Sequence, residues 1–101
     1  MNIEELQKWV SDDWKQHSTS SPSVELQLLF IMEELGEVAE AIRKNSGDKD
    51  RIQKVTDLGS EIADLIVSIT TLANHFNINL TNEIKGFQDR IEERRTTARS
   101  D

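Results

Sequence analysis

Residues 52–76 repeat apolar side chains at helical spacing, yet this apolar face includes an acid. At about 100° per residue, Glu61 lies about 40° from the direction shared by four apolar residues, which are Leu58, Leu65, Leu72 and Phe76. An ionised carboxylate inside an apolar face costs free energy unless a partner compensates for it. This segment is therefore predicted to be a helix whose packed face has to accommodate a charge.

The composition predicts a single all-α domain. The chain has 101 residues, with four glycines, one proline, no tyrosine and no cysteine. The lack of cysteine excludes disulfides and thiolate metal sites. A net charge of −7 disfavours binding to duplex nucleic acid. Neither a signal-peptide pattern nor an apolar run of membrane-spanning length is present, so we expect a cytoplasmic protein with no membrane partner.

The apolar periodicity predicts four helices, at residues 3–17, 22–44, 52–76 and 81–95. Asn2 and Glu5 form a capping box for the first helix, and Ser21 is the expected N-cap of the second. Residues 1–95 are expected to form the domain, followed by a disordered tail at residues 96–101. Trp9 is expected in the core. So is one face of the second helix, namely Leu28, Ile31, Met32, Leu35, Val38, Ala39 and Ile42.

Two pairs of acids lie three residues apart, Glu34 with Glu37 and Glu61 with Asp64, so each pair shares a helix face. If their helices pack antiparallel, as a short connection favours, the four carboxylates converge. Like charges about 4 Å apart repel by about 4 kcal/mol at an effective dielectric near 20. The site must then be protonated, held open by water, or filled by a cation such as Mg²⁺ or Mn²⁺. The alternative is that these acids simply face solvent.

These acids also fit a known pattern. Glu33-Glu34-x-x-Glu37 followed by Glu61-x-x-Asp64 resembles the EExxE…ExxD signature of the MazG-like nucleoside triphosphate pyrophosphohydrolases, part of the all-α NTP pyrophosphatase superfamily. The resemblance covers residues 22–95. It implies a helical bundle, with a four-helix core of antiparallel helices that is completed by homodimerisation or further assembly into a homotetramer. It also implies Mg²⁺-dependent hydrolysis of a ribo- or deoxyribonucleoside triphosphate to the monophosphate and pyrophosphate, with Mn²⁺ as a substitute, as a nucleotide-pool cleaning activity.

The resemblance further implies roles for individual residues. Glu33 is expected to be catalytic, as the group that orients the attacking water, or to be a further metal ligand. The expected metal ligands are Glu34, Glu37, Glu61 and Asp64.

The substrate contacts are expected outside the two acidic pairs. Many relatives carry a pattern like NxKFxxR on the last helix, where this chain has Arg90 and Arg94. These arginines are expected to contact phosphate oxygens, the alternative being a solvated basic face. Trp14 is the expected contact for the nucleobase, the alternative being a packing role.

Two other functions remain open. A dinuclear iron or manganese carboxylate bundle needs Glu-x-x-His on two helices, whereas Glu37 is followed at this spacing by Glu40, and Glu61 by Asp64. The other function is a non-catalytic helical oligomerisation or interaction module whose acids only keep an oligomer in solution.

Overall fold

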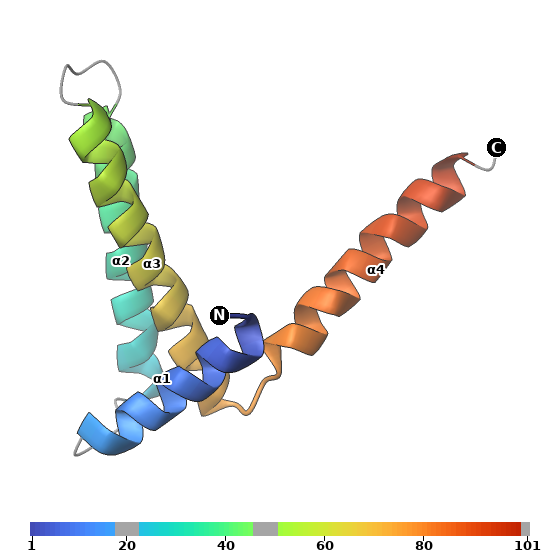
Figure 1. Ribbon diagram of the computed structural model, residues 1–101, viewed down its shortest axis with the longest axis horizontal. Helices are drawn as coiled ribbons and strands as arrows, with labels where there is room; N and C mark the ends of the chain where they lie inside the picture. The colour runs from blue at the N-terminus through green and yellow to red at the C-terminus, as the bar shows by residue number, and fades with distance from the viewer. Residues whose placement is uncertain (18–22, 46–50, 100–101) are drawn as a thin grey trace.

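The computed structural model describes residues 1–17, 23–45 and 51–99, without the side chains of residues 45, 51–56 and 99. In this part of the chain the structure is all-α, as predicted, and contains no strand (Figure 1). Its helices are α1 (Ile3–His17), α2 (Val24–Asn45), α3 (Arg51–His75) and α4 (Leu80–Arg99). None of these helices is both long and apolar enough to cross a membrane.

Side-chain caps set where the helices begin. The predicted capping box is confirmed, because the Glu5 amide donates to Asn2 Oδ1 at 2.8 Å and the Asn2 amide donates to Glu5 Oε1 at 3.1 Å. Ser23 Oγ accepts the Leu26 amide at 3.1 Å and caps α2. The predicted cap at Ser21 lies outside the described residues.

Residues 96–99, expected to belong to a disordered tail, are part of α4, which continues to Arg99. No glycine or proline follows Gly86 to stop the helix, and glutamate and arginine are good helix formers. Thr96 also bonds within the helix, its hydroxyl donating to the Glu92 carbonyl at 3.0 Å. The side chains of residues 96–98 are exposed, and the segment is nevertheless helical.

The helices form an open V rather than a closed bundle (Figure 1). The α2 and α3 helices make an antiparallel hairpin, α1 crosses the end of α3, and α4 points away from the hairpin. Gln7 fixes this junction: its Nε2 donates to Asn74 Oδ1 at 3.0 Å and to the Ile78 carbonyl at 2.8 Å, and its Oε1 accepts the Leu80 amide at 3.0 Å. The first helix is thereby tied to both α3 and the start of α4.

The face of α2 that meets α3 matches the one that the apolar pattern predicts only in part, at Ile31 and Val38. Gln27 is only 3% exposed, and its Nε2 donates to the Ser68 carbonyl at 3.1 Å. Half-buried residues continue this line at helical spacing, namely Ile31, Glu34, Val38 and Ala41. The predicted core was therefore wrong, within one chain, for the exposed Leu28, Met32, Leu35, Ala39 and Ile42.

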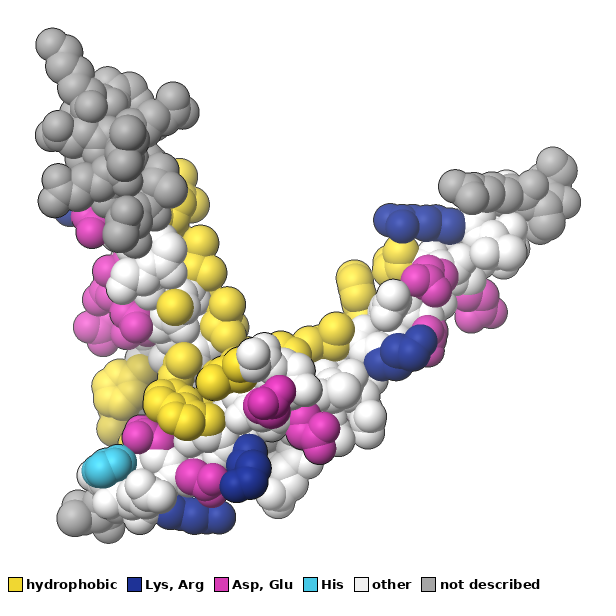
Figure 2. Space-filling model, viewed as in Figure 1, with side chains coloured by type: hydrophobic (Ala, Val, Ile, Leu, Met, Phe, Trp, Pro, Cys, Tyr) yellow, Lys and Arg dark blue, Asp and Glu magenta, His cyan; other side chains and the backbone are white. Residues whose placement is uncertain are grey.

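Large apolar side chains consequently remain on the surface of a single chain. Trp9, expected in the core, is 52% exposed, while its neighbour Val10 is buried. Figure 2 shows hydrophobic side chains along the inner sides of the hairpin and of α4. The expected four-helix core is not formed by the four helices of one chain.

Candidate metal centre

Three carboxylates from two helices meet at the seam between α2 and α3. Glu34 from α2 and Glu61 and Asp64 from α3 each offer one carboxylate oxygen, and these oxygens all lie within 4.8 Å of one another. Glu34 and Glu61 are half-buried, whereas Asp64 is exposed. These three residues are named the carboxylate cluster below. They meet because the helices are antiparallel and Glu34 occupies a seam position on α2.

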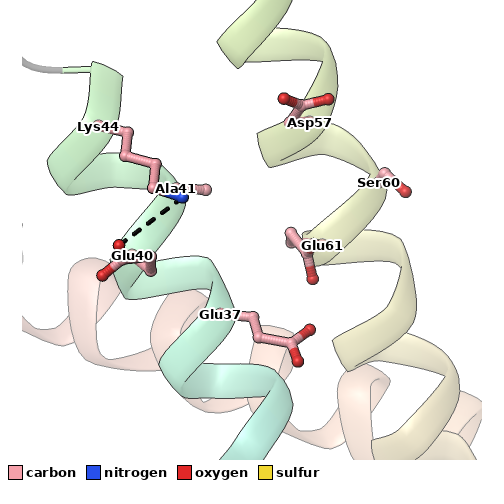
Figure 3. Close-up of a pocket in the computed structure, with 7 residues that line it drawn as sticks. All are labelled: Glu37, Glu40, Ala41, Lys44, Asp57, Ser60 and Glu61. Carbon is pink, nitrogen blue, oxygen red and sulfur yellow. Dashed lines mark ion pairs between the residues drawn. The ribbon is translucent and has the colours of Figure 1, made fainter.

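Glu37 lies at the edge of the carboxylate cluster. It is exposed, one turn after Glu34 on α2, and its carboxylate points toward Glu61 (Figure 3). Glu37 and Glu61 also belong to the lining of an adjoining hollow of about 300 Å³, which is completed by Glu40, Ala41, Lys44, Asp57 and Ser60. Glu33, the expected catalytic residue, is exposed beside Glu34. The structure therefore groups three of the four expected ligands closely and leaves Glu37 and Glu33 beside them.

The surroundings of the carboxylate cluster disfavour its ionised form. Burial raises the pKa of Glu34, and the negative charges of Glu37 and Asp64 raise it further. The pKa of Glu61 is also raised, first by a hydrogen bond with Glu37 and then by burial and the neighbouring carboxylates. Gathering these acids is therefore unfavourable when no cation is bound.

The donor set fits a hard divalent cation. Oε2 of Glu34 and Oε2 of Glu61 are shielded from solvent and have no hydrogen-bond partner among the described residues. Buried acceptors without donors are costly, and a bound cation would satisfy them. Mg²⁺ prefers oxygen ligands, and this group of side chains offers carboxylate oxygens alone.

The raised pKa values predict how the stability of the metal-free protein depends on pH. Protonation of Glu34 and Glu61 stabilises the fold fully below their ordinary value of 4.5, and this stabilisation is lost as pH rises through their raised folded-state values. Lys8 lowers the pKa of Asp12, and Arg43 lowers the pKa of Glu40. The stability that these two ion pairs contribute is instead lost as pH falls. Thermal melts of the chelator-treated wild type and of the Glu34→Gln/Glu61→Gln variant test this prediction. The melting temperature should fall as pH rises above 4.5 in the wild type only. Parallel curves would contradict it.

The expected substrate contacts lie elsewhere in the chain. Trp14 is half-buried on α1 and lines a separate hollow beside α3. Arg90 and Arg94 are exposed on α4, where they line a hollow with Glu93, Thr97 and Ala98. Because α4 points away from the hairpin (Figure 1), one chain does not bring these arginines to the carboxylate cluster.

The polar spacing on α3 also indicates further residues that the sequence analysis did not include among the expected site residues. On α3 the spacing of Glu61, Asp64 and Ser68 continues, at three and then four residues, to Thr71 and His75. Both line the hollow that contains Trp14. Following the polar line to the end of the helix would have identified them.

Comparison with known proteins identifies the family of the chain. Residues 23–98 match the family model described as the MazG nucleotide pyrophosphohydrolase domain. The chain belongs to the MazG family. Two crystal structures of iMazG from Vibrio DAT 722 share its fold. The C-terminally tagged form has a TM-score of 0.63 and 26% identity over 89% of this chain and 99% of that chain. The N-terminally tagged form has a TM-score of 0.64 and 25% identity over 91% and 97%.

A curated relative has a similar length. The uncharacterized protein YvdC of Bacillus subtilis strain 168 is 24% identical over 102 residues, which cover 93% of this chain and 96% of YvdC. The MazG assignment itself rests on residues 23–98, and it indicates nucleotide pyrophosphohydrolase chemistry at the family level.

Proposed function

We propose that this protein is a Mg²⁺-dependent pyrophosphohydrolase that converts nucleoside triphosphates to monophosphates and pyrophosphate. Membership of the MazG family supports the reaction class. The observation that carries the proposal is the carboxylate cluster, in which two shielded carboxylate oxygens lack any hydrogen-bond partner among the described residues. Removal of surplus or noncanonical nucleotides in the cytoplasm is the corresponding cellular role.

In this mechanism the chain positions a cation and a water molecule. Glu34, Glu61 and Asp64 would hold Mg²⁺, with Glu37 as the ligand at the edge. Mg²⁺, with Mn²⁺ as a substitute, would neutralise negative charge on the triphosphate as the bond between its α- and β-phosphates breaks and pyrophosphate leaves. Glu33, solvent-exposed and adjacent to Glu34, would orient the attacking water and accept its proton. No covalent enzyme intermediate is required.

The alternative functions receive less support. In the described residues, the group of side chains that could hold a metal contains carboxylates alone, without the histidines of a dinuclear iron bundle. A non-catalytic interaction module would explain the exposed apolar surface. It would not explain why Glu34 and Glu61 each place a shielded carboxylate oxygen, without a hydrogen-bond partner among the described residues, beside other acids.

We also propose that the functional unit is a homodimer, or a homotetramer built from two dimers. Monomeric proteins rarely expose large contiguous apolar surfaces, whereas this chain exposes apolar residues on both arms of the V, including Leu35 at 56% and Phe87 at 58% (Figure 2). A second copy packed on these faces would complete the bundle. It would also allow Arg90 and Arg94 of one copy to contact a triphosphate bound by another.

Replacing Phe87 with aspartate is expected to dissociate the oligomer. The charge would have to be buried in an apolar interface, which is costly without a partner. Sedimentation velocity should show a smaller species than wild type. Thermal melts should show a lower melting temperature that depends more strongly on protein concentration. The exposed neighbour Gln88 supplies the control, since Gln88→Glu also adds a negative charge to α4. Equal dissociation by both changes would indicate a general charge effect.

A nucleotide panel tests the proposed activity. The protein is incubated with Mg²⁺ and each of the eight common ribo- and deoxyribonucleoside triphosphates, and pyrophosphate release is measured. Release of pyrophosphate, rather than of orthophosphate, from at least one substrate is expected. Lack of release from every nucleotide, together with lack of stabilisation by Mg²⁺, would favour the interaction module.

A further inference from the structure

Two polar contacts in the seam between α2 and α3 share one antiparallel register. Gln27 of α2 lies beside Ser68 of α3, since its Nε2 donates to the Ser68 carbonyl at 3.1 Å. Seven residues farther along α2, Glu34 meets Glu61, which precedes Ser68 by the same number of residues. Seven residues are about two helical turns, so the contacts lie about 10 Å apart along the seam. The register that allows the Gln27 bond is therefore the one that assembles the carboxylate cluster.

Burial of apolar surface does not by itself select this arrangement of α2 within one chain. Two polar residues interrupt the line of α2 that faces α3, which consists of Gln27, Ile31, Glu34, Val38 and Ala41. The line one residue later at each position is entirely apolar, namely Leu28, Met32, Leu35, Ala39 and Ile42. A rotation of α2 by about 100° would place this second line against α3. Because apolar burial would favour that rotation, a more specific contact has to oppose it.

Gln27 provides such a contact. Its side chain is only 3% exposed, and it is one of three buried polar side chains in the described part of the chain, with Thr70 and Thr71. The two threonine hydroxyls donate within α3, to the carbonyls of Ile66 and Val67. Gln27 instead bonds across the seam. A buried polar group that finds its partner in one arrangement disfavours the others, as a buried polar residue does when it fixes the register of a coiled coil.

We propose that Gln27 is a positioning residue for the metal centre, whose bond to Ser68 holds α2 in the register and orientation in which Glu34 faces Glu61 and Asp64. A slide of α2 by one turn would move Glu34 by about 5.4 Å along α3, and a rotation of about 100° would turn it away from the seam. Either displacement would remove Glu34 from the carboxylate cluster. The inference rests on the proposed function, and it adds to that function a residue outside the acidic motif.

Gln27→Leu tests this role, because leucine is apolar and cannot donate to Ser68. The metal-free variant should melt at the same temperature as wild type or higher, since an apolar side chain replaces a buried polar one and the Ser68 carbonyl keeps its bond within α3. The Kd for Mn²⁺, measured by electron paramagnetic resonance of the free ion, should rise by at least about tenfold. The Mg²⁺ concentration that gives half-maximal turnover should rise with it. Gln27→Met, with an unbranched side chain, should behave in the same way and replaces Gln27→Leu if that variant does not fold.

Thr70→Val is the matched control. Thr70 is 2% exposed, and its hydroxyl donates to the Ile66 carbonyl of its own helix at 2.8 Å. This change also removes a buried polar group, but no bond between the helices, so the Kd for Mn²⁺ should stay unchanged. An equal loss of Mn²⁺ affinity in both variants would overturn the proposal in favour of a general effect of core substitutions. Unchanged affinity in Gln27→Leu, while wild type binds Mn²⁺, would refute the role of Gln27 and spare the proposed function.

A distance measurement tests the register without any metal. The chain has no cysteine, so nitroxide labels can be attached to Glu25→Cys on α2 and Ala63→Cys on α3, two exposed positions. Double electron–electron resonance is recorded on metal-free protein diluted with unlabelled protein, which suppresses distances between copies. Gln27→Leu should shift or broaden the distance distribution relative to the same labelled chain with Gln27, and identical distributions would overturn the proposal. If wild type binds no metal, the proposed function fails, and this measurement decides the role of Gln27 alone.

Discussion

Glu61→Gln is expected to lose pyrophosphohydrolase activity while its metal-free form melts at the same temperature as wild type or higher. Glutamine keeps the size of glutamate but removes a charged ligand from the carboxylate cluster. Mutating a residue that only hydrogen-bonds to a metal ligand typically lowers metal affinity or activity by about 10–100-fold. Loss of a ligand itself should therefore lower activity by at least about 100-fold. Stability should not fall, because the substitution removes repulsion from Glu34, Glu37 and Asp64. Pyrophosphate release and thermal melts in a chelator measure the two effects.

Glu40→Gln is the matched control for this variant. Glu40 lies on α2 and lines the hollow next to Glu61, but its Oε1 lies 2.7 Å from Arg43 Nη2 in an exposed ion pair. Its loss should leave turnover within about twofold of wild type and lower stability only slightly, since exposed pairs contribute little. An active Glu61→Gln enzyme would exclude Glu61 as an essential ligand. Unfolding of Glu61→Gln would instead reveal a structural hydrogen bond.

Mg²⁺ is expected to raise the melting temperature of the wild-type protein by on the order of 10 °C. A ligand at about 100 times its Kd stabilises the folded state by about 2.7 kcal/mol, and each kcal/mol shifts the midpoint of a domain of this size by about 4–8 °C. The physical reason is that one cation satisfies two shielded carboxylate oxygens and cancels the repulsion around them. Differential scanning calorimetry at fixed protein concentration measures the shift, and a chelator should reverse it.

Ionic screening is the competing explanation for such a shift, because salt also weakens repulsion between carboxylates. Sodium chloride at matched ionic strength is therefore the solution control, and it should give a much smaller increase. The Glu34→Gln/Asp64→Asn variant is the protein control, and it should lose most of the shift caused by Mg²⁺. An equal effect of sodium chloride and Mg²⁺ would mean that the carboxylates attract counterions without binding a metal.

Much of the helical architecture could be read from local signals. Asn2 and Glu5 cap α1 reciprocally, as their spacing predicts, because a capping box depends only on residues three positions apart. The same holds for the break after α3, where Asn77 adopts a positive φ of 53° and the Ile78 amide bonds back to the Ala73 carbonyl at 3.0 Å. The end of α4 was missed because a helix can continue without packing when it lacks stop signals.

The acidic spacing identified the candidate ligands before any coordinates, because residues three apart on a helix share a face whatever the helix packs against. The same periodicity could not decide which face of α2 meets α3. Leu35 and Glu34 lie about 100° apart, and the more apolar face, with Leu35, was the reasonable expectation. The structure instead places Glu34 in the seam and leaves Leu35 56% exposed.

Tertiary packing decides which face of α2 meets α3, because this depends on which two helix surfaces fit together. It also depends on which other part of the protein covers the remaining face. Gln27 at one end of the seam bonds to α3, and Glu34 meets Glu61 and Asp64 farther along it. The direction of α4 is likewise set by distant contacts, through the Gln7 side chain of α1. The amino-acid order alone determined four helices and the acids that share their faces. Only the tertiary structure decided which faces meet, because periodicity specifies directions around a helix axis and not the neighbours found there.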